Sequence, residues 1–160
     1  MNLSDFLNEQ TIYCPIVANT RNSAIQELLN NVQSLGLLSS TMKLYKYIEE
    51  FENNQSTAAG KGVAYPHSTS IEIESLTCIL GVSKSGLDFN SPDGQPCHII
   101  LLSLSPKEDP EKHRKLITLF RSMIADSTIR TSILEAENST DILNIINDWE
   151  EKELLMDDLD

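Results

Sequence analysis

The chain has few basic residues, and this shortage limits what it is expected to bind. Among its 160 residues, 12 lysines and arginines stand against 24 aspartates and glutamates, which gives a formal net charge of −12 at pH 7. Such a charge repels phosphate backbones and anionic lipid surfaces, so we expect no nucleic-acid partner and no membrane partner. It would steer a basic protein toward the chain, although solubility alone is the simpler reason for the acidity.

Long apolar runs are also absent. No stretch approaches the roughly 20 apolar residues that a membrane span needs, and the N-terminal sequence MNLSDFLNEQ lacks the basic and apolar regions of a secretory signal. We therefore expect a cytoplasmic protein. With 40% hydrophobic and 22% charged residues, a chain of this length is expected to form one globular domain.

Several chemistries lack their characteristic residues. The cysteines Cys14, Cys78 and Cys97 are an odd number without close spacing, so neither a disulfide framework nor a zinc site is expected, and the last two lie in apolar runs typical of buried, inert thiols. The motifs GxxxxGK[ST], GxGxxG and GxSxG do not occur, which leaves nucleotide folds of those kinds and hydrolase chemistry unsupported. Three widely spaced histidines predict no metal site, and no cofactor is expected.

The apolar pattern predicts an α/β fold. Short β-branched or aromatic runs predict strands at 10–18, 62–65, 76–82 and 97–104. Helical spacing predicts helices at 22–35, from residue 39 or 40 to about 52, from Asp109-Pro110 to about 124, at 126–138 and at 139–154. We expect a single-domain sandwich with a central mixed β-sheet of about five strands, flanked by helices on both faces.

Local signals predict where these elements stop. Gly36 is expected to end the first helix, the polar segment 53–60 to form a loop, and the sequence SPDG at 91–94 to form a turn. Residues 1–152 are expected to form the domain. The acidic residues 153–160 are expected to form a C-terminal tail that frays.

The segment GKGVAYPHS at 60–68 gives one histidine a defined position. Gly60 and Gly62 permit unusual φ values, and Pro66 fixes φ directly before His67. His67 is therefore expected where a strand ends and a polar loop begins, which is a common place for reactive groups. On these features alone, an idle surface histidine is an equally good account.

The hydroxyl residues after His67 and the two other histidines have simpler interpretations that stay open. Ser68 and Thr69 offer donors that could hold an anion. His113 shares a helix face with apolar residues, so a histidine at the rim of the core is the simpler account. His98 begins an apolar strand and is expected to be a packed or edge histidine.

Three stretches together resemble a known family. The sequences STAAGKGVAYPHS (56–68), SGLDFNSPDGQPCHIILLSLSP (85–106) and HRKLITLFRSMIAD (113–126) look like the enzyme IIA domain of the fructose/mannitol class (type 2) of the phosphoenolpyruvate-dependent sugar phosphotransferase system. This class includes the nitrogen-regulatory IIA proteins. A short domain without a membrane portion is more similar to that regulatory branch than to a transporter fusion.

The resemblance implies a phosphoryl relay. His67 would accept a phosphoryl group from an HPr/NPr-like phosphocarrier protein, and His113 would stabilise the group during transfer. Thr57, Ser68 and Thr69 would form the phosphate cradle. One nitrogen of His67 must be free to attack, so we expect the other to donate to a backbone carbonyl. The next partner would be a regulated target protein or a permease IIB domain, and the family needs no metal.

Two positions depart from the family pattern. The family carries an arginine–glutamate pair about sixteen residues before the histidine, where this chain has Phe51-Glu52. A guanidinium that could pair with phosphate is therefore missing there, at a cost on the order of 2 kcal/mol in binding the phosphoryl group. Ser68 replaces a glycine and is expected to restrict the turn. The alternative function is thus a non-catalytic regulatory binding module that is weakly or never phosphorylated.

Overall fold

A central mixed sheet organises the chain. The computed structural model describes residues 1–107 and 110–159, the last without its side chain. Its strands are β1 (Ile12–Tyr13), β2 (Ala58–Gly60), β3 (Val63–Ala64), β4 (His67–Thr69), β5 (Thr77–Leu87) and β6 (Cys97–Ser105). They form a 6-stranded sheet in the order β1-β5-β6-β3-β2, with β4 also paired to β6. The expected mixed sheet is confirmed, with one strand more than expected.

The antiparallel pair of β5 and β6 forms the centre of this sheet. β1 runs parallel to β5, and both β3 and β4 run parallel to β6. Residues Ile99 to Leu102 are all buried, although their side chains alternate between the two faces of the sheet. Such continuous burial requires a cover on both faces.

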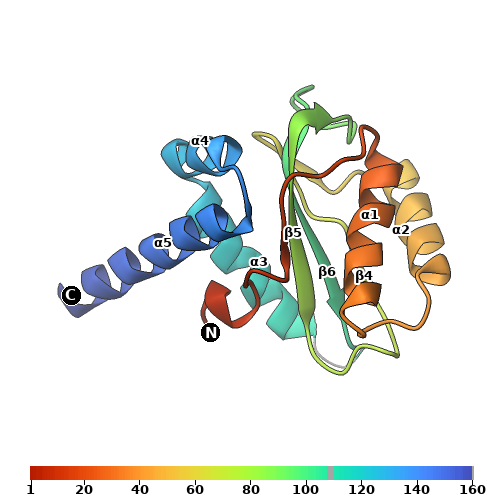
Figure 1. The fold of residues 1–160 in the computed structure, drawn as a ribbon, viewed down its shortest axis with the longest axis horizontal. Helices are drawn as coiled ribbons and strands as arrows, with labels where there is room; N and C mark the ends of the chain where they lie inside the picture. Colours follow the sequence, from red (N-terminus) through yellow and green to blue (C-terminus); the bar gives the residue numbers. More distant parts are fainter. Residues whose placement is uncertain (108–109, 160) are drawn as a thin grey trace.

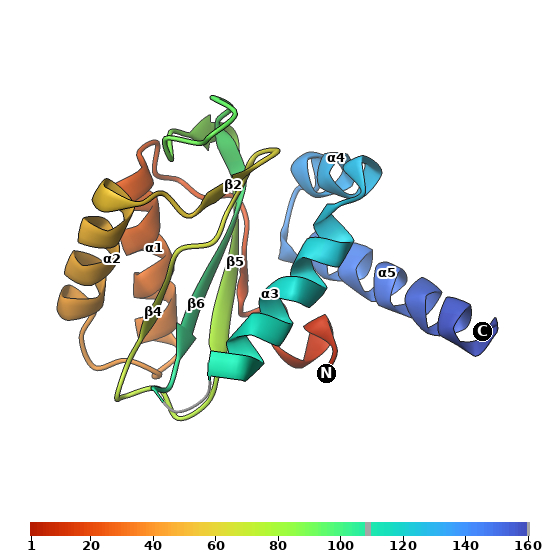
Figure 2. The ribbon, with the colours of Figure 1, turned by 180° about the vertical axis from the view of Figure 1, so that it is seen from behind.

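Helices supply that cover (Figures 1 and 2). They are the 3₁₀ turn η1 (Leu3–Asp5) and the helices α1 (Arg21–Ser34), α2 (Met42–Asn54), α3 (Pro110–Ile124), α4 (Ser127–Glu135) and α5 (Ser139–Leu159). One apolar core joins the sheet to α1 and α2, and the other joins its opposite face to η1 and α3–α5. The structure confirms an α/β sandwich with helices on both faces. No helix among the described residues is both long and apolar enough to cross a membrane.

The first helix shows how local sequence sets an element. The side chain of Thr20 caps α1 by accepting a hydrogen bond from Ser23 N at 3.2 Å. The buried positions recur at helical spacing: Ala24, Ile25, Leu28, Leu29 and Val32. Gly36 follows the helix at φ +81°, a conformation that favours glycine. The predicted helix and its end are confirmed.

Other predicted boundaries are wrong. β1 covers two residues and not 10–18; Pro15, just beyond it, has no N–H for a ladder. The predicted loop at 53–60 is wrong at both ends, because α2 extends to Asn54 and β2 begins at Ala58. α2 begins at Met42 and not at residue 39 or 40.

The C-terminal segment and the start of α3 test two further expectations. α5 continues to Leu159, so the acidic segment after residue 152 is helical and carries the C-terminus away from the sheet (Figure 1). The boundary between a domain and a tail at residue 152 stays a prediction. The predicted capping residue Asp109 lies outside the described residues. Asp126 does cap α4, by accepting from Thr128 N at 2.9 Å.

The path around β3 and β4 positions the histidine of 60–68. Gly60, Lys61 and Gly62 have φ values of +85°, +57° and +79°, which confirms the expected unusual backbone at the glycines. β3 and β4 then follow the same strand β6, with His67 paired to Ser103. Pro66 lies in the break between them, so His67 sits at the start of β4, where the chain resumes pairing. The expectation that a strand ends and a loop begins at His67 is wrong, because β4 pairs with β6.

Candidate active site

A hollow of about 350 Å³ opens beside His67. α2, the segment 56–59, the β3–β4 break and α3 all contribute side chains to it. We call it the histidine hollow; its lining includes Phe51, Gln55, Thr57, Tyr65, His67, His113, Ile117 and Arg121. Two histidines that lie 46 residues apart in the sequence thus meet in one place, with ring centroids 5.4 Å apart.

The tautomer of His67 follows from its backbone contact. Its Nδ1 lies 3.0 Å from the carbonyl oxygen of Tyr65. A carbonyl oxygen can only accept, so Nδ1 must carry a proton, and in the neutral ring Nε2 keeps its lone pair. This is the backbone carbonyl contact that the sequence led us to expect. The side chain is exposed, so this free nitrogen belongs to an accessible imidazole.

His113 has a different environment. It is half-buried, and its Nε2 finds no hydrogen-bond partner among the described residues. Burial lowers the pKa of His113, and the neighbouring His67 lowers it further. His113 is therefore neutral at pH 7. An unpaired buried nitrogen is costly, and such costs are found where a ligand can supply the missing partner.

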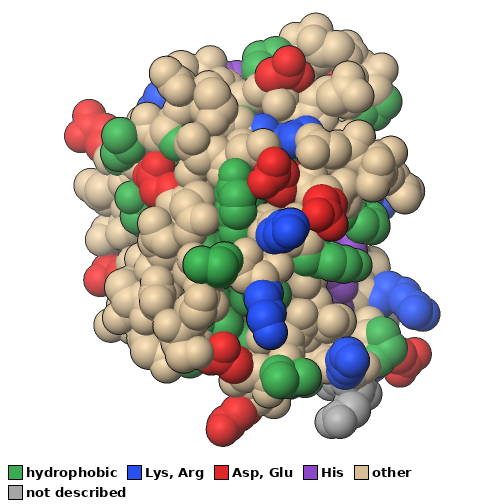
Figure 3. Space-filling model, turned by 90° about the vertical axis from the view of Figure 1, so that its right-hand side faces the viewer, with side chains coloured by type: hydrophobic (Ala, Val, Ile, Leu, Met, Phe, Trp, Pro, Cys, Tyr) green, Lys and Arg blue, Asp and Glu red, His purple; other side chains and the backbone are tan. Residues whose placement is uncertain are grey.

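Phe51 forms an apolar wall against His67. Their ring centroids lie 5.6 Å apart at an interplanar angle of 61°, an edge-on contact. Tyr47 stacks behind Phe51 at 6.4 Å. Figure 3 views the face that α1 and α2 cover, and histidine lies beside hydrophobic side chains toward one edge of it. This wall brings no charge to the hollow.

Glu52 fixes the segment that carries Thr57. Glu52 is 3% exposed, and its carboxylate accepts a hydrogen bond from Thr57 N at 3.0 Å. It also accepts a hydrogen bond from the hydroxyl of Thr57. That hydroxyl has one proton, so it cannot donate to a phosphate while it donates to Glu52. Thr57 lines the hollow, and its place in a phosphate cradle stays a prediction.

The other two residues of the expected cradle lie in β4, and their place in a cradle stays a prediction. Ser68 is buried, and its hydroxyl donates to the carbonyl of Thr69 at 3.1 Å. Neither residue belongs to the lining of the histidine hollow, as far as the described residues go. Among described non-glycine residues only Lys61 and Asn90 have positive φ, so Ser68 fits β4 without the expected restriction.

Sequence reasoning missed two residues of the hollow. Tyr65 is buried, packs edge-on against Phe120 at 6.1 Å and lies under the guanidinium of Arg121, 5.2 Å from its ring. Burial raises the pKa of Tyr65, and Arg121 partly offsets the rise. Arg121 follows Ile117 by four residues, and Ile117 follows His113 by four, so helical spacing could have indicated it.

The remaining candidates have structural roles. His98 donates from Nδ1 to the carbonyl of Ser83 at 2.9 Å, which agrees with the simpler account of a packed histidine. Burial raises the pKa of Cys78 and of Cys97 to about 12, so both thiols stay protonated and inert. Within the described ranges, no three His, Cys, Asp or Glu side chains are grouped so that they could hold a metal ion.

Together these groups can hold and accept an anion. An exposed imidazole with one fixed proton offers a nucleophilic nitrogen. A second imidazole beside it has an unsatisfied nitrogen, and a guanidinium lines the same hollow. The lining described contains no carboxylate that would repel negative charge.

The family model described as "Phosphoenolpyruvate-dependent sugar phosphotransferase system, EIIA 2" matches residues 5–149. The chain belongs to this family. The resemblance carried by 56–68, 85–106 and 113–126 is therefore confirmed over residues 5–149. The family comprises phosphoryl-relay and regulatory domains.

Relatives include both transporter and regulatory proteins. A fructose-specific EIIABC component of Bacillus subtilis is 27% identical over 147 residues, which are 92% of this chain and 23% of that protein. A nitrogen regulatory protein of Bradyrhizobium diazoefficiens is 23% identical over 146 residues, 91% of this chain and 95% of that protein. The chain thus spans about a quarter of the transporter component and nearly all of the regulatory protein.

Solved structures agree on the fold. The nitrogen regulatory protein IIA-Ntr from Neisseria meningitidis aligns with a TM-score of 0.81 at 19% identity, covering 90% of this chain and 98% of that one. Enzyme IIA for mannitol from Escherichia coli, solved in complex with phosphorylated enzyme IIB, aligns with a TM-score of 0.75 at 14% identity. The alignment covers 88% of this chain and 96% of that one. At these identities the likeness shows the fold alone.

The lowered pKa of His113 makes stability depend on pH. The folded state favours neutral His113. As pH falls below the ordinary histidine pKa of about 6.5, which applies to the unfolded chain, the unfolded state therefore binds more protons than the folded state. We expect this contribution to the free energy of unfolding to be present above that pH and to be lost as pH falls toward the folded pKa. Urea unfolding of the wild type and of His113→Gln at several pH values measures it: the variant should lose less stability on acidification. NMR titration that places the pKa of His113 at or above 6.5 would contradict the account.

The buried carboxylate of Glu52 provides a second test. We expect Glu52→Ala to lower the free energy of unfolding by about 1–3 kcal/mol, because Thr57 N–H loses its acceptor in a buried place. Glu50→Ala, on an exposed position of the same helix, is the matched control and should change it by less than about 0.5 kcal/mol. Equal effects from the two variants in urea unfolding would show that Glu52 does not hold the segment.

Proposed function

We propose that this chain is a phosphoryl-relay and regulatory protein whose phosphoryl acceptor is His67. One observation carries the proposal: the Tyr65 carbonyl fixes the proton of His67 on Nδ1, and so leaves Nε2 as an accessible nucleophile. The position beside His113, in a hollow whose described lining has no carboxylate, supports an anionic substrate. Family membership supports a relay within the sugar phosphotransferase system.

The transfer uses no metal and moves no proton between the two imidazole rings that exchange the phosphoryl group. Nε2 of His67 attacks the phosphorus of a phosphohistidine on an HPr/NPr-like phosphocarrier. One N–P bond forms as the other breaks, and the electron pair of the broken bond stays on the carrier's nitrogen. The proton of His67 stays on Nδ1, which donates it to the Tyr65 carbonyl, and that hydrogen bond strengthens as the ring gains positive charge.

His113 stabilises the group as it arrives. The phosphoryl group brings about two negative charges, and its oxygens give the buried Nε2 of His113 the partner it lacks. An anion beside His113 raises the pKa of its imidazole, so the ring can take up a proton and neutralise part of that charge. His113 thus acts through positioning and charge, as is general for phosphoryl transfer.

Charge and relatives indicate the partners. The net charge of −12 favours docking of a basic surface, which suits a phosphocarrier and opposes nucleic acid or anionic membranes. The mannitol enzyme IIA solved with phosphorylated enzyme IIB supports a permease IIB domain as the next acceptor. The nitrogen regulatory relative supports a regulated target protein instead. We place both exchanges in the cytoplasm.

A second candidate function rests on Phe51. Its ring packs edge-on against His67 where the family pattern has an arginine, so it offers a phosphoryl group no charge. In this alternative the chain docks on target proteins as a regulatory module and is weakly or never phosphorylated.

Phosphorylation assays separate the two functions. We expect incubation with radiolabelled phosphoenolpyruvate, enzyme I and a cognate phosphocarrier to give an acid-labile, base-stable label. His67→Ala should abolish the label. His113→Ala should slow labelling on the order of 100-fold, because it removes one preorganised group from the transition state. His98→Gln, outside the hollow, should label at the wild-type rate.

Each result has a clear opposite. Wild type that stays unlabelled would favour the binding module, and a label that survives in His67→Ala would remove His67 from the acceptor role. An unchanged rate in His113→Ala would leave His113 without a part in the transfer.

A further inference from the structure

Arg121 is the one arginine or lysine among the described residues that line the histidine hollow. It comes from α3, the helix that also carries His113, eight residues further on. Eight residues advance a helix by about 12 Å. Long helical side chains lean back toward the N-terminus, which for Arg121 is the direction of His113. Such a lean is compatible with the place of Arg121 in the lining of the hollow, which it shares with both histidines; it also lines a neighbouring hollow beside Gly60 and Lys61.

The guanidinium lies over an aromatic ring. It sits 5.2 Å from the centroid of Tyr65, the residue whose carbonyl holds His67. Arg121 is exposed, and in the described part of the chain no carboxylate forms an ion pair with it. The contact with Tyr65 keeps the charge beside the hollow. Breaking this contact costs less free energy than breaking a salt bridge would. An anion entering the hollow can therefore recruit it.

The rest of the lining explains why a cation matters there. Phe51 places an apolar ring against one side of His67 without supplying charge. Charges beside apolar groups are screened less than charges in open water. His113 is neutral before the phosphoryl group arrives. Arg121 is thus the permanent positive charge available to a group carrying about two negative charges.

We propose that Arg121 is a catalytic residue that binds the oxygens of the phosphoryl group on His67 and stabilises them during transfer. This inference rests on the proposed function and adds a residue to it. A guanidinium presents two parallel N–H donors that match two phosphoryl oxygens. Arg121 exchanges no proton; the N–P bond forms at His67 Nε2 as the carrier's N–P bond breaks.

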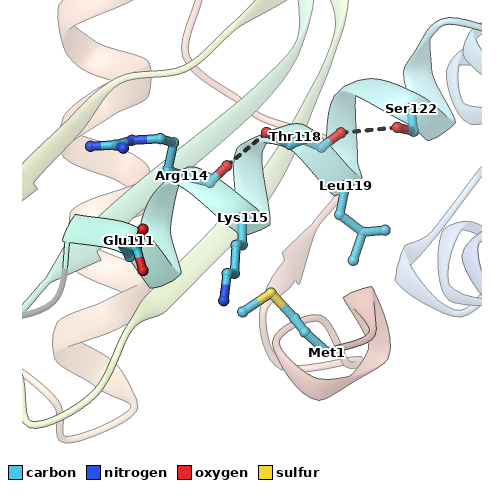
Figure 4. A pocket seen from close by; sticks show the side chains of 7 residues that line it. All are labelled: Met1, Glu111, Arg114, Lys115, Thr118, Leu119 and Ser122. Atoms are coloured by element: carbon cyan, nitrogen blue, oxygen red, sulfur yellow. Dashed lines mark hydrogen bonds between the residues drawn. The ribbon is translucent and has the colours of Figure 1, made fainter.

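The same helix offers a matched control (Figure 4). Arg114 and Lys115 lie on another side of α3, where they line a separate groove of about 410 Å³ with Met1 and Leu119. Figure 4 shows Lys115 extending toward Met1, and neither basic residue belongs to the lining of the histidine hollow. Arg114→Gln therefore removes the same charge from the same helix without touching the hollow.

The test is single-turnover labelling by saturating phosphorylated carrier. Arg121→Gln should slow labelling by about 10- to 100-fold at saturation, because a charge-assisted contact with the transferring group is lost. Arg114→Gln should keep the saturating rate. A second guanidinium placed on the opposite wall, in the double variant Phe51→Arg with Arg121→Gln, should recover most of the loss. Circular dichroism checks that each variant is folded.

An unchanged saturating rate in Arg121→Gln would overturn the proposal. A rise only in the carrier concentration needed for half-saturation would also overturn it, since that would make Arg121 a docking residue.

Inorganic phosphate, followed through the imidazole NMR signals, separates this proposal from the relay itself. If wild type is never labelled but phosphate shifts the His67 and His113 signals in wild type and not in Arg121→Gln, the relay fails and anion binding by Arg121 stands. If labelling and phosphate shifts are both absent, both proposals fail.

Discussion

The hydrogen bond from His67 Nδ1 to the Tyr65 carbonyl determines which nitrogen the site can use. The bond depends on the backbone between β3 and β4, where both segments are held by pairing with β6. Tyr65 itself is anchored by its buried ring against Phe120. The orientation of one imidazole is thus set by the centre of the sheet on one side and by α3 on the other, and a reactive group on an exposed position inherits the rigidity of the core.

The electrostatics of the hollow differ from those of the chain around it. The chain carries a net charge of −12, yet the described lining has two histidines and one arginine and no carboxylate. Glu52 is a buried acid that directly follows Phe51 of the lining, and its carboxylate accepts from Thr57 N. In the proposed function these two features have different roles: the acidic surface would attract a basic protein, and the hollow would accept the anion which that protein carries.

Sequence reasoning reached the parts of the structure that depend on local pattern. Apolar spacing and Gly36 gave α1 correctly, and the motif at 60–68 located His67. The resemblance brought His113 to the same site, and the two rings do meet. The short strand β2 was missed, because pairing with β3 stabilises a segment whose composition is typical of a loop. The boundaries of α2 were also misplaced.

Side-chain directions were less accessible. Ser68 offered a donor that could hold an anion, but its place in β4 buries it and its hydroxyl donates to the Thr69 carbonyl. Phe51 drew attention to a missing guanidinium at one point of the chain, while Arg121 reaches the same hollow from α3. Which side chains share a cavity is decided by how helices pack across the sheet, and a single sequence carries little information about that.

The site of phosphorylation within the imidazole tests the central claim most directly. Nitrogen NMR of the phosphorylated protein, with its histidine rings isotopically labelled, distinguishes a phosphoryl group on Nε2 from one on Nδ1. The hydrogen bond to Tyr65 leads us to expect the phosphoryl group on Nε2 of His67, with Nδ1 still protonated. A phosphoryl group on Nδ1 would contradict the account, because that nitrogen could not then donate to the carbonyl that orients the ring.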